Sequence, residues 1–317
     1  MATIINQQGI TEEQWLENRR KGLGGSDAGA VLGFNKYTSP YKLFLEKTGV
    51  YKEEFDSEAA YFGHVLEDVV RKEFEKRTGK KVITNDNLYV HDEYSFMQAN
   101  LDGEIEGENA GFEAKTASEY LKDEWVGDEI PASYLCQLHH YMAVMNYDRM
   151  YIAYLIGGNK FGWKVVNKDP EFEKILIERE KWFWEECVLK NEPPEVDGSD
   201  ATSSLFNSMY PEDDGTEIML GKDLETVIDA LEQVKKDIKE LDVLKKKYEN
   251  EIKKVMEKAK KGHTQKHLVV YSSYETNRID SKKLKEEKPE LFEEYSKKSV
   301  TRKMTIKKLE ETKNGNN

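Results

Sequence analysis

The chain has 317 residues, of which 38% are hydrophobic and 11% aromatic, so it can bury a core and is not intrinsically disordered. Its two cysteines exclude a disulfide scaffold. The absence of a long apolar run and of a secretory leader favours a cytoplasmic protein without a membrane span. The net charge of −13 is uneven, with −18 in residues 1–216 and +5 in residues 217–317. A basic groove on an acidic body can still bind DNA, so charge does not exclude it.

Apolar periodicity predicts alternating helices and strands over the first two thirds of the chain. The expected helices, in chain order, are a pair within 11–33, then 40–48, 58–78, 131–146 and 170–190. The expected strands are 81–90, 94–106, 111–117, 149–156 and 161–166. A turn-rich linker is predicted over 192–214, because it opens on Glu-Pro-Pro.

The last hundred residues differ in character from the rest. From Leu224 to Ala259 apolar residues recur at alternating steps of three and four, which predicts a long coiled-coil-like helix. Lys245 occupies one seam position, where a charge can set the register. A strand-like stretch at 266–274 and a helix at 281–296 follow. We therefore expect a first domain over residues 1–215 and a helical, coiled-coil-like extension over 216–317.

Candidate catalytic residues lie on the predicted hairpin. Because residues two apart on a strand share a face, Glu113 and Lys115 lie on one side of it while Phe112 and Ala114 face the core. Asp102 ends the preceding strand, where sheet pairing would bring it close to Glu113. Two carboxylates with a main-chain carbonyl suit Mg²⁺, a hard ion that takes oxygen ligands. Such an ion would polarise a phosphate, and Lys115 would orient the attacking water or stabilise developing charge.

Each of these features also has a purely structural interpretation. An Asp-Gly pair after a strand is a common turn, and Glu-x-Lys on a strand is often a solvated face. Ser26 fits a helix N-cap with or without DNA. Beside Gly24 and Gly25 it would also offer N–H groups to a phosphate, with Arg19 closing the site. These glycines fit neither a Walker loop nor a dinucleotide fingerprint.

The combined pattern resembles the PD-(D/E)xK nuclease superfamily, and more closely the YqaJ-like viral recombinases related to phage lambda exonuclease. The superfamily pattern is an Asp at a strand end followed by Glu-x-Lys on the next strand, here LDG at 101–103 and GFEAK at 111–115. Three further segments match in order: WLENR at 15–19 leading to Ser26, GHVLE at 63–67, and the helix 131–141 with its Gln-x-x-x-Tyr arrangement. The resemblance covers about residues 11–190, although the usual Pro before the Asp motif is absent.

The resemblance implies a fold and a set of roles. The fold is an α/β PD-(D/E)xK core, restriction-endonuclease-like, with a mixed central sheet flanked by helices. The implied catalytic set is Asp102, Glu113, Lys115, Gln137 and Glu67. The implied ligands of one or two Mg²⁺ or Mn²⁺ ions are Asp102, Glu113, Glu67 and the main-chain carbonyl of Ala114. The implied contacts to a 5′-phosphate or to DNA are Arg19, Ser26, Tyr141 and His140.

Several of these residues keep a structural alternative. Glu67 could be a solvated residue on the polar side of its helix, and Gln137 and Tyr141, one turn apart, could be ordinary core-edge residues. His140 fits an interior histidine as well as a DNA contact. Arg20 and Lys21 remain substitutes for Arg19.

The implied activity is metal-dependent phosphodiester hydrolysis of the alkaline-exonuclease type. Such an enzyme digests linear double-stranded DNA 5′→3′ and leaves 3′ single-stranded tails for annealing. The resemblance also implies a phage- or prophage-encoded protein in a bacterial host, a homo-oligomer such as the trimeric ring of the lambda enzyme, and a RecT-type annealing partner. The alternatives are a PD-(D/E)xK endonuclease and a non-catalytic DNA-binding or assembly protein on a degenerate nuclease fold.

Overall fold

The structure is a computed structural model that describes residues 2–7, 9–52 and 58–307. The last ten residues of the expected extension lie outside the described residues. The chain divides into two compact units, Met1–Met209 and Tyr210–Asn317. None of the helices within the described ranges is long and apolar enough to cross a lipid bilayer.

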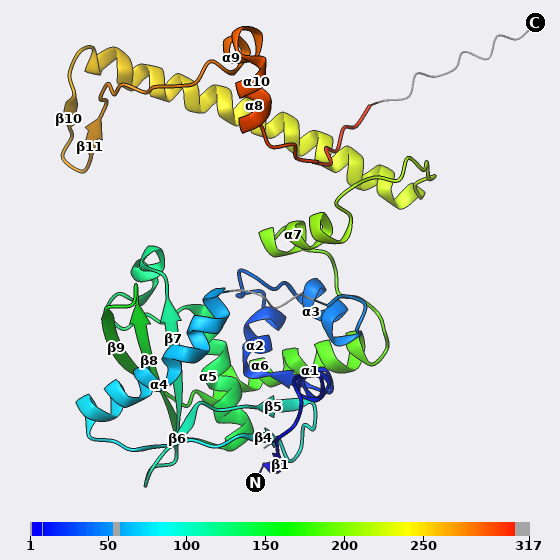
Figure 1. The fold of residues 1–317 in the computed structure, drawn as a ribbon, viewed down its shortest axis with the longest axis vertical. Helices are drawn as coiled ribbons and strands as arrows, with labels where there is room; N and C mark the ends of the chain where they lie inside the picture. The colour runs from blue at the N-terminus through cyan, green and yellow to red at the C-terminus, as the bar shows by residue number, and fades with distance from the viewer. Residues whose placement is uncertain (1, 8, 53–57, 308–317) are drawn as a thin grey trace, which may run out of the picture. The chain divides into compact units, whose positions relative to one another are not determined.

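The first unit is built on a five-stranded mixed sheet with the order β3-β6-β7-β8-β9 (Figure 1). Its members are β3 (Val82–Ile83), β6 (Gly103–Ile105), β7 (Ala110–Ala117), β8 (Arg149–Ile156) and β9 (Lys160–Asn167). Strands β7 and β8 pair in parallel, while the other neighbours are antiparallel. The parallel pair is possible because helix α5 (Ala132–Met145) lies within the long connection between its strands. The expected mixed α/β fold with helices flanking the sheet is confirmed.

A second, four-stranded sheet has the order β1-β4-β5-β2. It comprises β1 (Thr3–Asn6), β2 (Leu23–Gly24), β4 (Asn87–Val90) and β5 (Met97–Ala99). The segments 81–90 and 94–106, each expected to be a single strand, therefore both divide between the two sheets. The chain changes sheet between Ala99 and Gly103, and this crossing places Asp102 beside strand β7.

Helices cover both faces of the five-stranded sheet. On one face α4 (Glu58–Thr78) packs Val70 and Phe74 against Phe112, with the two phenyl centroids 4.9 Å apart. Complete burial of each such side chain contributes roughly 1.5–3 kcal/mol. On the other face α5 packs Leu138 and Met142 into the larger core cluster. The sheet is thus buried on both sides, as parallel strand pairs require.

The remaining helices of this unit surround the second sheet and the ends of the first. They are α1 (Glu12–Arg20), α2 (Gly25–Val31), α3 (Pro40–Lys47), the 3₁₀ helix η1 (Glu119–Trp125), α6 (Pro170–Trp182), the π-helical continuation η2 (Phe183–Val188) and α7 (Asp200–Met209). Helix α7 lies within 192–214, so the prediction of a linker there is wrong in part. This helix forms because Thr202 and Leu205 are buried and Asp197 accepts hydrogen bonds from Ser199 and Thr202.

The second unit is dominated by α8 (Lys222–Met256), a single helix of 35 residues, which confirms the helix expected from the heptads. A hairpin of β10 (Lys261–His263) and β11 (Leu268–Val270) follows. The helix expected at 281–296 is two helices, α9 (Ser281–Glu287) and α10 (Pro289–Tyr295). Pro289 separates them, because proline lacks the N–H that a continuous helix would need.

Candidate active site

Glu113 and Lys115 lie on β7 and point to the same face of the sheet, as the sequence predicts. Glu113 is only 2% exposed, so this face is not a solvated one. Lys115 Nζ donates a hydrogen bond to Glu113 Oε1 at 2.5 Å and lies 5.2 Å from the ring centroid of Tyr134. A carboxylate buried to this degree costs free energy unless it is paired or holds a cation.

Asp102 lies beside Glu113 because of the strand register. Gly103 pairs with Phe112, so the residue that precedes β6 falls opposite the middle of β7. Asp102 Oδ2 accepts a hydrogen bond from the main-chain N–H of Ala114 at 2.8 Å. In a strand the N–H and C=O of one residue point the same way, so the Ala114 carbonyl is directed to the same edge as Asp102.

Glu113, Asp102 and Lys115 shift one another's pKa values. Burial, and then the charge of Asp102, raise the pKa of Glu113 to about 8. Burial also raises the pKa of Asp102, against the opposing charge of Lys115. Burial alone would lower the pKa of Lys115, but the charges of Glu113 and Asp102 outweigh it and raise it. Two carboxylates and an ammonium that shift one another's pKa values are typical of a functional site.

Glu67 on α4 faces the same pocket. The pocket measures about 260 Å³ and is lined by Ala60, Gly63, His64, Glu67, Asp102, Glu113, Ala114, Lys115 and Thr116. The Glu67 side chain is one-third exposed, and His64 Nδ1 lies 3.5 Å from its Oε2. Burial, and then the charge of Asp102, raise the pKa of Glu67. The charge of Asp102 therefore acts on Glu67, as it would not on a surface carboxylate far from Asp102.

Gln137 on α5 contacts the Glu113 carboxylate directly. Its Nε2 donates to Glu113 Oε1 at 2.7 Å and to the hydroxyl of Tyr141 at 3.0 Å. Both residues are buried, which follows from their positions one turn apart on the face of α5 that covers the sheet. The structure therefore brings Gln137 to Glu113 and makes Tyr141 its internal neighbour.

The donor set fits a divalent cation. Glu113 Oε2 is buried and has no hydrogen-bond partner among the described residues. Over the same residues, no three His, Cys, Asp or Glu side chains converge closely enough to form a metal cage. Mg²⁺ does not need such a cage, since it keeps several waters and commonly binds through one or two carboxylates. Glu113 and Asp102, with the Ala114 carbonyl beside them, meet that requirement.

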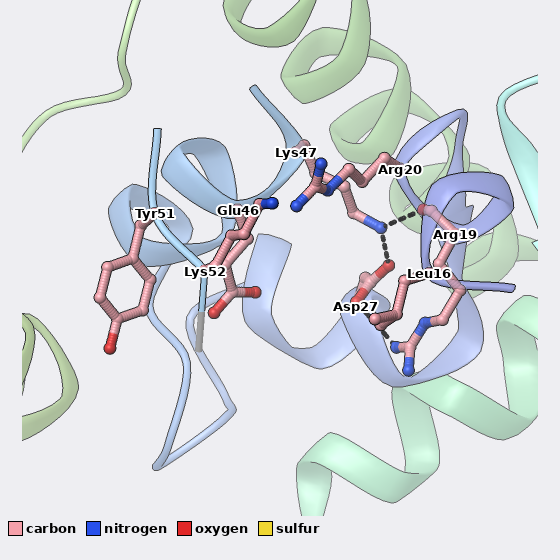
Figure 2. Close-up of a pocket in the computed structure, with 8 residues that line it drawn as sticks. All are labelled: Leu16, Arg19, Arg20, Asp27, Glu46, Lys47, Tyr51 and Lys52. Atoms are coloured by element: carbon pink, nitrogen blue, oxygen red, sulfur yellow. Dashed lines mark hydrogen bonds and ion pairs between the residues drawn. The ribbon is translucent and has the colours of Figure 1, made fainter. Parts of the chain in front are cut away.

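A second pocket, of about 150 Å³, holds the Arg19 segment (Figure 2). It is lined by Leu16, Arg19, Arg20, Asp27, Glu46, Lys47, Tyr51 and Lys52. The guanidinium of Arg19 donates to Ser26 Oγ at 3.1 Å and stacks over the Trp15 ring at 4.9 Å. The structure thus brings Arg19 and Ser26 together, and both side chains remain accessible to solvent.

The buried pair in this pocket is Asp27 and Lys47. Lys47 Nζ lies 2.6 Å from Asp27 Oδ2 and donates to the Arg19 carbonyl at 2.8 Å. Burial raises the pKa of Asp27, but the charges of Lys47 and Arg19 outweigh it and hold it below its ordinary value. Neither Asp27 nor Lys47 was predicted as a site residue, because their contact joins α2 to α3 and leaves no local spacing signal.

The expected N-cap role of Ser26 is wrong. The N-cap of α2 is Gly24, whose N–H donates to Asp27 Oδ2 at 2.9 Å. Asp27 therefore satisfies the N–H group that the sequence offered to a phosphate. Ser26 lies one residue inside the helix, exposed, with its hydroxyl toward Arg19.

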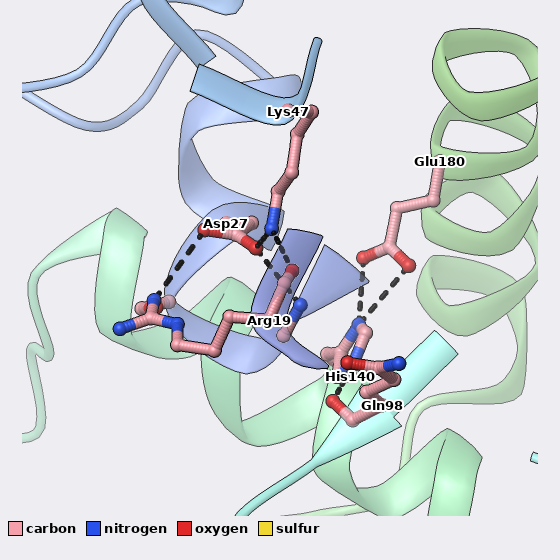
Figure 3. Close-up of polar contacts among 8 residues, drawn as sticks. Arg19, Asp27, Lys47, Gln98, His140 and Glu180 are labelled. Atoms are coloured by element: carbon pink, nitrogen blue, oxygen red, sulfur yellow. Dashed lines mark hydrogen bonds and ion pairs between the residues drawn. The ribbon is translucent and has the colours of Figure 1, made fainter. Parts of the chain in front are cut away.

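His140 is an interior residue that lies beside Glu180 and Gln98 (Figure 3) and is not among the residues that line the Glu113 pocket. It is fully buried, its Nδ1 is 2.8 and 3.0 Å from the two carboxylate oxygens of Glu180, and its Nε2 is 2.9 Å from the Gln98 carbonyl oxygen. Both ring nitrogens thus face acceptors, which favours the imidazolium form. Burial lowers the pKa of His140, but the charge of Glu180 outweighs it and raises it. Of the two interpretations that the sequence left open, the structure supports the interior histidine.

Tyr134 belongs to the motif that the sequence showed on this helix but was assigned no role, and Glu180 was not predicted. Tyr134 lies under the Lys115 ammonium, and the only available signal was its place three residues before Gln137 on the same helix. Glu180 lies forty residues from His140 and comes from α6, so only the packing of α6 on α5 reveals it.

Comparison with known proteins places the chain in a family. Residues 14–148 match the YqaJ-like viral recombinase domain. YqaJ of Bacillus subtilis (strain 168) is 41% identical over 305 residues, which cover 95% of each chain. Protein D345L of African swine fever virus (strain Badajoz 1971 Vero-adapted) is 33% identical over 82 residues, 26% of this chain and 24% of that protein. The crystal structure of an alkaline exonuclease from Laribacter hongkongensis aligns with a TM-score of 0.48 and 16% identity over 62% of this chain and 97% of its own. The chain therefore belongs to the family of YqaJ-like viral recombinases.

Proposed function

We propose that this protein is a metal-dependent 5′→3′ exonuclease that resects linear double-stranded DNA and leaves 3′ single-stranded tails for recombination by annealing. The observation that carries the proposal is the buried, unpaired oxygen of Glu113, beside Asp102 and in a pocket that also contains Lys115. This oxygen lies in a pocket beside a second carboxylate, where a bound cation would satisfy it.

The residues of the pocket have distinct roles in this proposal. Asp102, Glu113 and the Ala114 carbonyl would hold Mg²⁺ or Mn²⁺, and Glu67 would contribute to a second ion. When bound, the ion would supply Lewis acidity toward the phosphate and activate water. Lys115 remains protonated, because its pKa is raised, and donates to the attacking water or to a phosphate oxygen. Gln137 keeps Glu113 oriented.

The Arg19 pocket supports the proposed polarity. Arg19 and Ser26 present a guanidinium and a hydroxyl side by side, and Arg20 and Lys52 add positive charge to the same pocket, whereas the charge of Lys47 is paired with Asp27. A terminal phosphate monoester carries more charge than an internal diester, so a compact cluster of cations favours a 5′-phosphorylated end. An endonuclease of the same superfamily would not require a preference for a 5′-phosphorylated end.

The expected partners also belong to this proposal. They are double-stranded DNA ends, further copies of the chain in a ring-like oligomer, and a RecT-type annealing protein in the cytoplasm of a bacterial host. The family assignment to viral recombinases supports the last of these.

The test uses three substrates with the full chain. Linear duplexes that bear a 5′-phosphate or a 5′-hydroxyl, and a closed circle, are incubated with Mg²⁺ and with chelator. We expect nucleotide release from the phosphorylated linear duplex alone, and only with the metal. Cleavage of the circle would indicate an endonuclease, and no metal-dependent loss of any substrate would indicate a non-catalytic DNA-binding protein.

Two variants test the roles of the two pockets separately. Lys115→Ala should lose at least about a hundredfold in single-turnover rate while DNA affinity is retained. Arg19→Ala should lower the rate on the 5′-phosphorylated end to that on the 5′-hydroxyl end, which the substitution should not change. Lys122→Ala is the matched control, because Lys122 is an exposed lysine that pairs with Glu119 on η1. A fully active Lys115→Ala protein would refute the assignment of the nuclease activity to this pocket.

A further inference from the structure

Helix α8 carries an apolar stripe that no other described part of the second unit covers. We define the apolar stripe by nine residues that follow the heptad spacing and are each between 36% and 84% exposed: Leu224, Val227, Leu231, Val234, Ile238, Leu241, Tyr248, Ile252 and Val255. The hairpin β10–β11 packs at the end of the helix, where Gly262 lies against Met256, which is not a stripe residue. An exposed stripe of this length marks an interaction surface.

From this stripe and its charges, we infer that α8 pairs with α8 of a second copy of the chain, side by side and antiparallel. Only one antiparallel register covers the whole helix. It sets the ends of the stripe against each other and matches the layers between them: Leu224 with Val255, Val227 with Ile252, Leu231 with Tyr248, Val234 with Lys245, and Ile238 with Leu241. Each layer occurs twice by symmetry, so the 35-residue helix is covered over about 53 Å.

The charges beside the stripe select this direction. In the antiparallel register Lys235 of one copy faces Asp242 of the other, and symmetry repeats the contact. In a parallel pair Asp237 would face Asp242, and the two Lys245 side chains would meet in the same layer. The antiparallel register instead puts the two Lys245 positions about 16 Å apart along the axis. Like charges in register are unfavourable, and the residues that flank a seam set its orientation.

The inference does not depend on the nuclease site, because every residue that carries it lies on α8. It adds to a ring-like arrangement of the first unit a separate contact that can join two copies through their extensions. A loss of nuclease activity would leave this contact unaffected, and a monomeric α8 would leave the nuclease proposal unaffected.

Cysteine cross-linking of the full chain tests the direction. The native cysteines, Cys136 and Cys187, are buried and give little background. Leu231→Cys and Tyr248→Cys proteins are oxidised mildly, separately and mixed, and resolved on non-reducing gels. We expect a disulfide-linked pair only in the mixture. Cross-linking of each protein by itself would show a parallel pair, and no cross-linking in any sample would overturn the inference.

Charge exchange tests the same contact without new cysteines. Lys235→Glu and Asp242→Lys should each weaken self-association about tenfold, because two symmetric contacts change sign, and the double exchange should restore it. Lys239→Glu, on the outer face, is the matched control, and circular dichroism verifies the helix in each variant. Sedimentation equilibrium provides the association constants. Tighter association of Asp242→Lys would contradict the antiparallel register, as would a chain that is monomeric at every concentration.

Discussion

Substitution of Gln137 tests whether its hydrogen bond keeps the Glu113 carboxylate ionised. Its amide donates to Glu113 Oε1 at 2.7 Å in a buried environment, and this bond stabilises the charged form of Glu113. In Gln137→Leu the side chain keeps about the same size but loses the donor. A hydrogen bond to a charged group contributes about 1.5–3 kcal/mol, and one pKa unit corresponds to 1.36 kcal/mol. The pKa of Glu113, about 8 in the parent, should therefore rise by roughly one to two units.

The consequence for activity has a definite sign. A higher pKa leaves less ionised Glu113 near neutral pH, so the rate should fall about ten- to a hundredfold there. Raising the pH should recover much of the loss, because ionisation is then restored. The assay is release of nucleotides from a 5′-phosphorylated duplex at a Mg²⁺ concentration below saturation, where protonation of Glu113 competes with metal binding, followed from pH 7 to pH 10.

Tyr141→Phe is the matched control for this prediction. It removes the hydroxyl that accepts from Gln137 but leaves the Gln137 to Glu113 bond in place, so the rate should change only a fewfold. Melting temperatures verify that each variant is folded. A Gln137→Leu protein within about twofold of the parent at every pH would refute the reasoning, as would a loss of activity that does not depend on pH.

Three further predictions concern packing, pH and metal. In Gly25→Ala the new β-carbon would lie 2.4 Å from Cε1 of Tyr141, so calorimetry should show a loss of about 1–3 kcal/mol of stability, whereas Gly198→Ala, with no atom in contact, should be neutral. Because the folded pKa of His140 is raised, the stabilisation by Glu180 is complete below about pH 6.5 and is lost as the pH rises through the folded value. The difference in unfolding free energy between the parent and Glu180→Gln should therefore shrink with rising pH in urea titrations, and a constant difference would contradict this. Chelation of divalent cations should abolish nucleotide release, and Mg²⁺ should restore it, without a large change in the far-ultraviolet spectrum.

Local patterns predicted much of the architecture because they depend on near neighbours in the chain. The spacing of apolar residues predicted α4, α5 and α8 with boundaries close to those observed. It failed over 192–214, where α7 forms because Thr202 and Leu205 are buried by contacts from elsewhere. It also failed over 94–106, because a strand pattern does not reveal that the chain changes sheet.

In the candidate site, too, local patterns predicted some features and missed others. Alternation on one strand placed Glu113 and Lys115 together, and this holds because the period of a strand is fixed by its backbone. The sequence left open whether that face was solvated, and it could not show that Gln137 from another helix would donate to Glu113. It also proposed Ser26 as an N-cap, a role that belongs to Gly24 because the Asp27 side chain reaches back to its N–H.

The sequence by itself determined the family resemblance, the residue types at the catalytic strand and the periodic stripe of α8, since each is a regularity along the chain. Only the tertiary structure decided which groups are buried and which of them meet. Burial turns Glu113 from a surface carboxylate into one with a pKa of about 8 and an unpaired oxygen. It likewise turns His140 from a possible DNA contact into an internal partner of Glu180. Desolvation depends on every element packed around a group, and that information is not local to any motif.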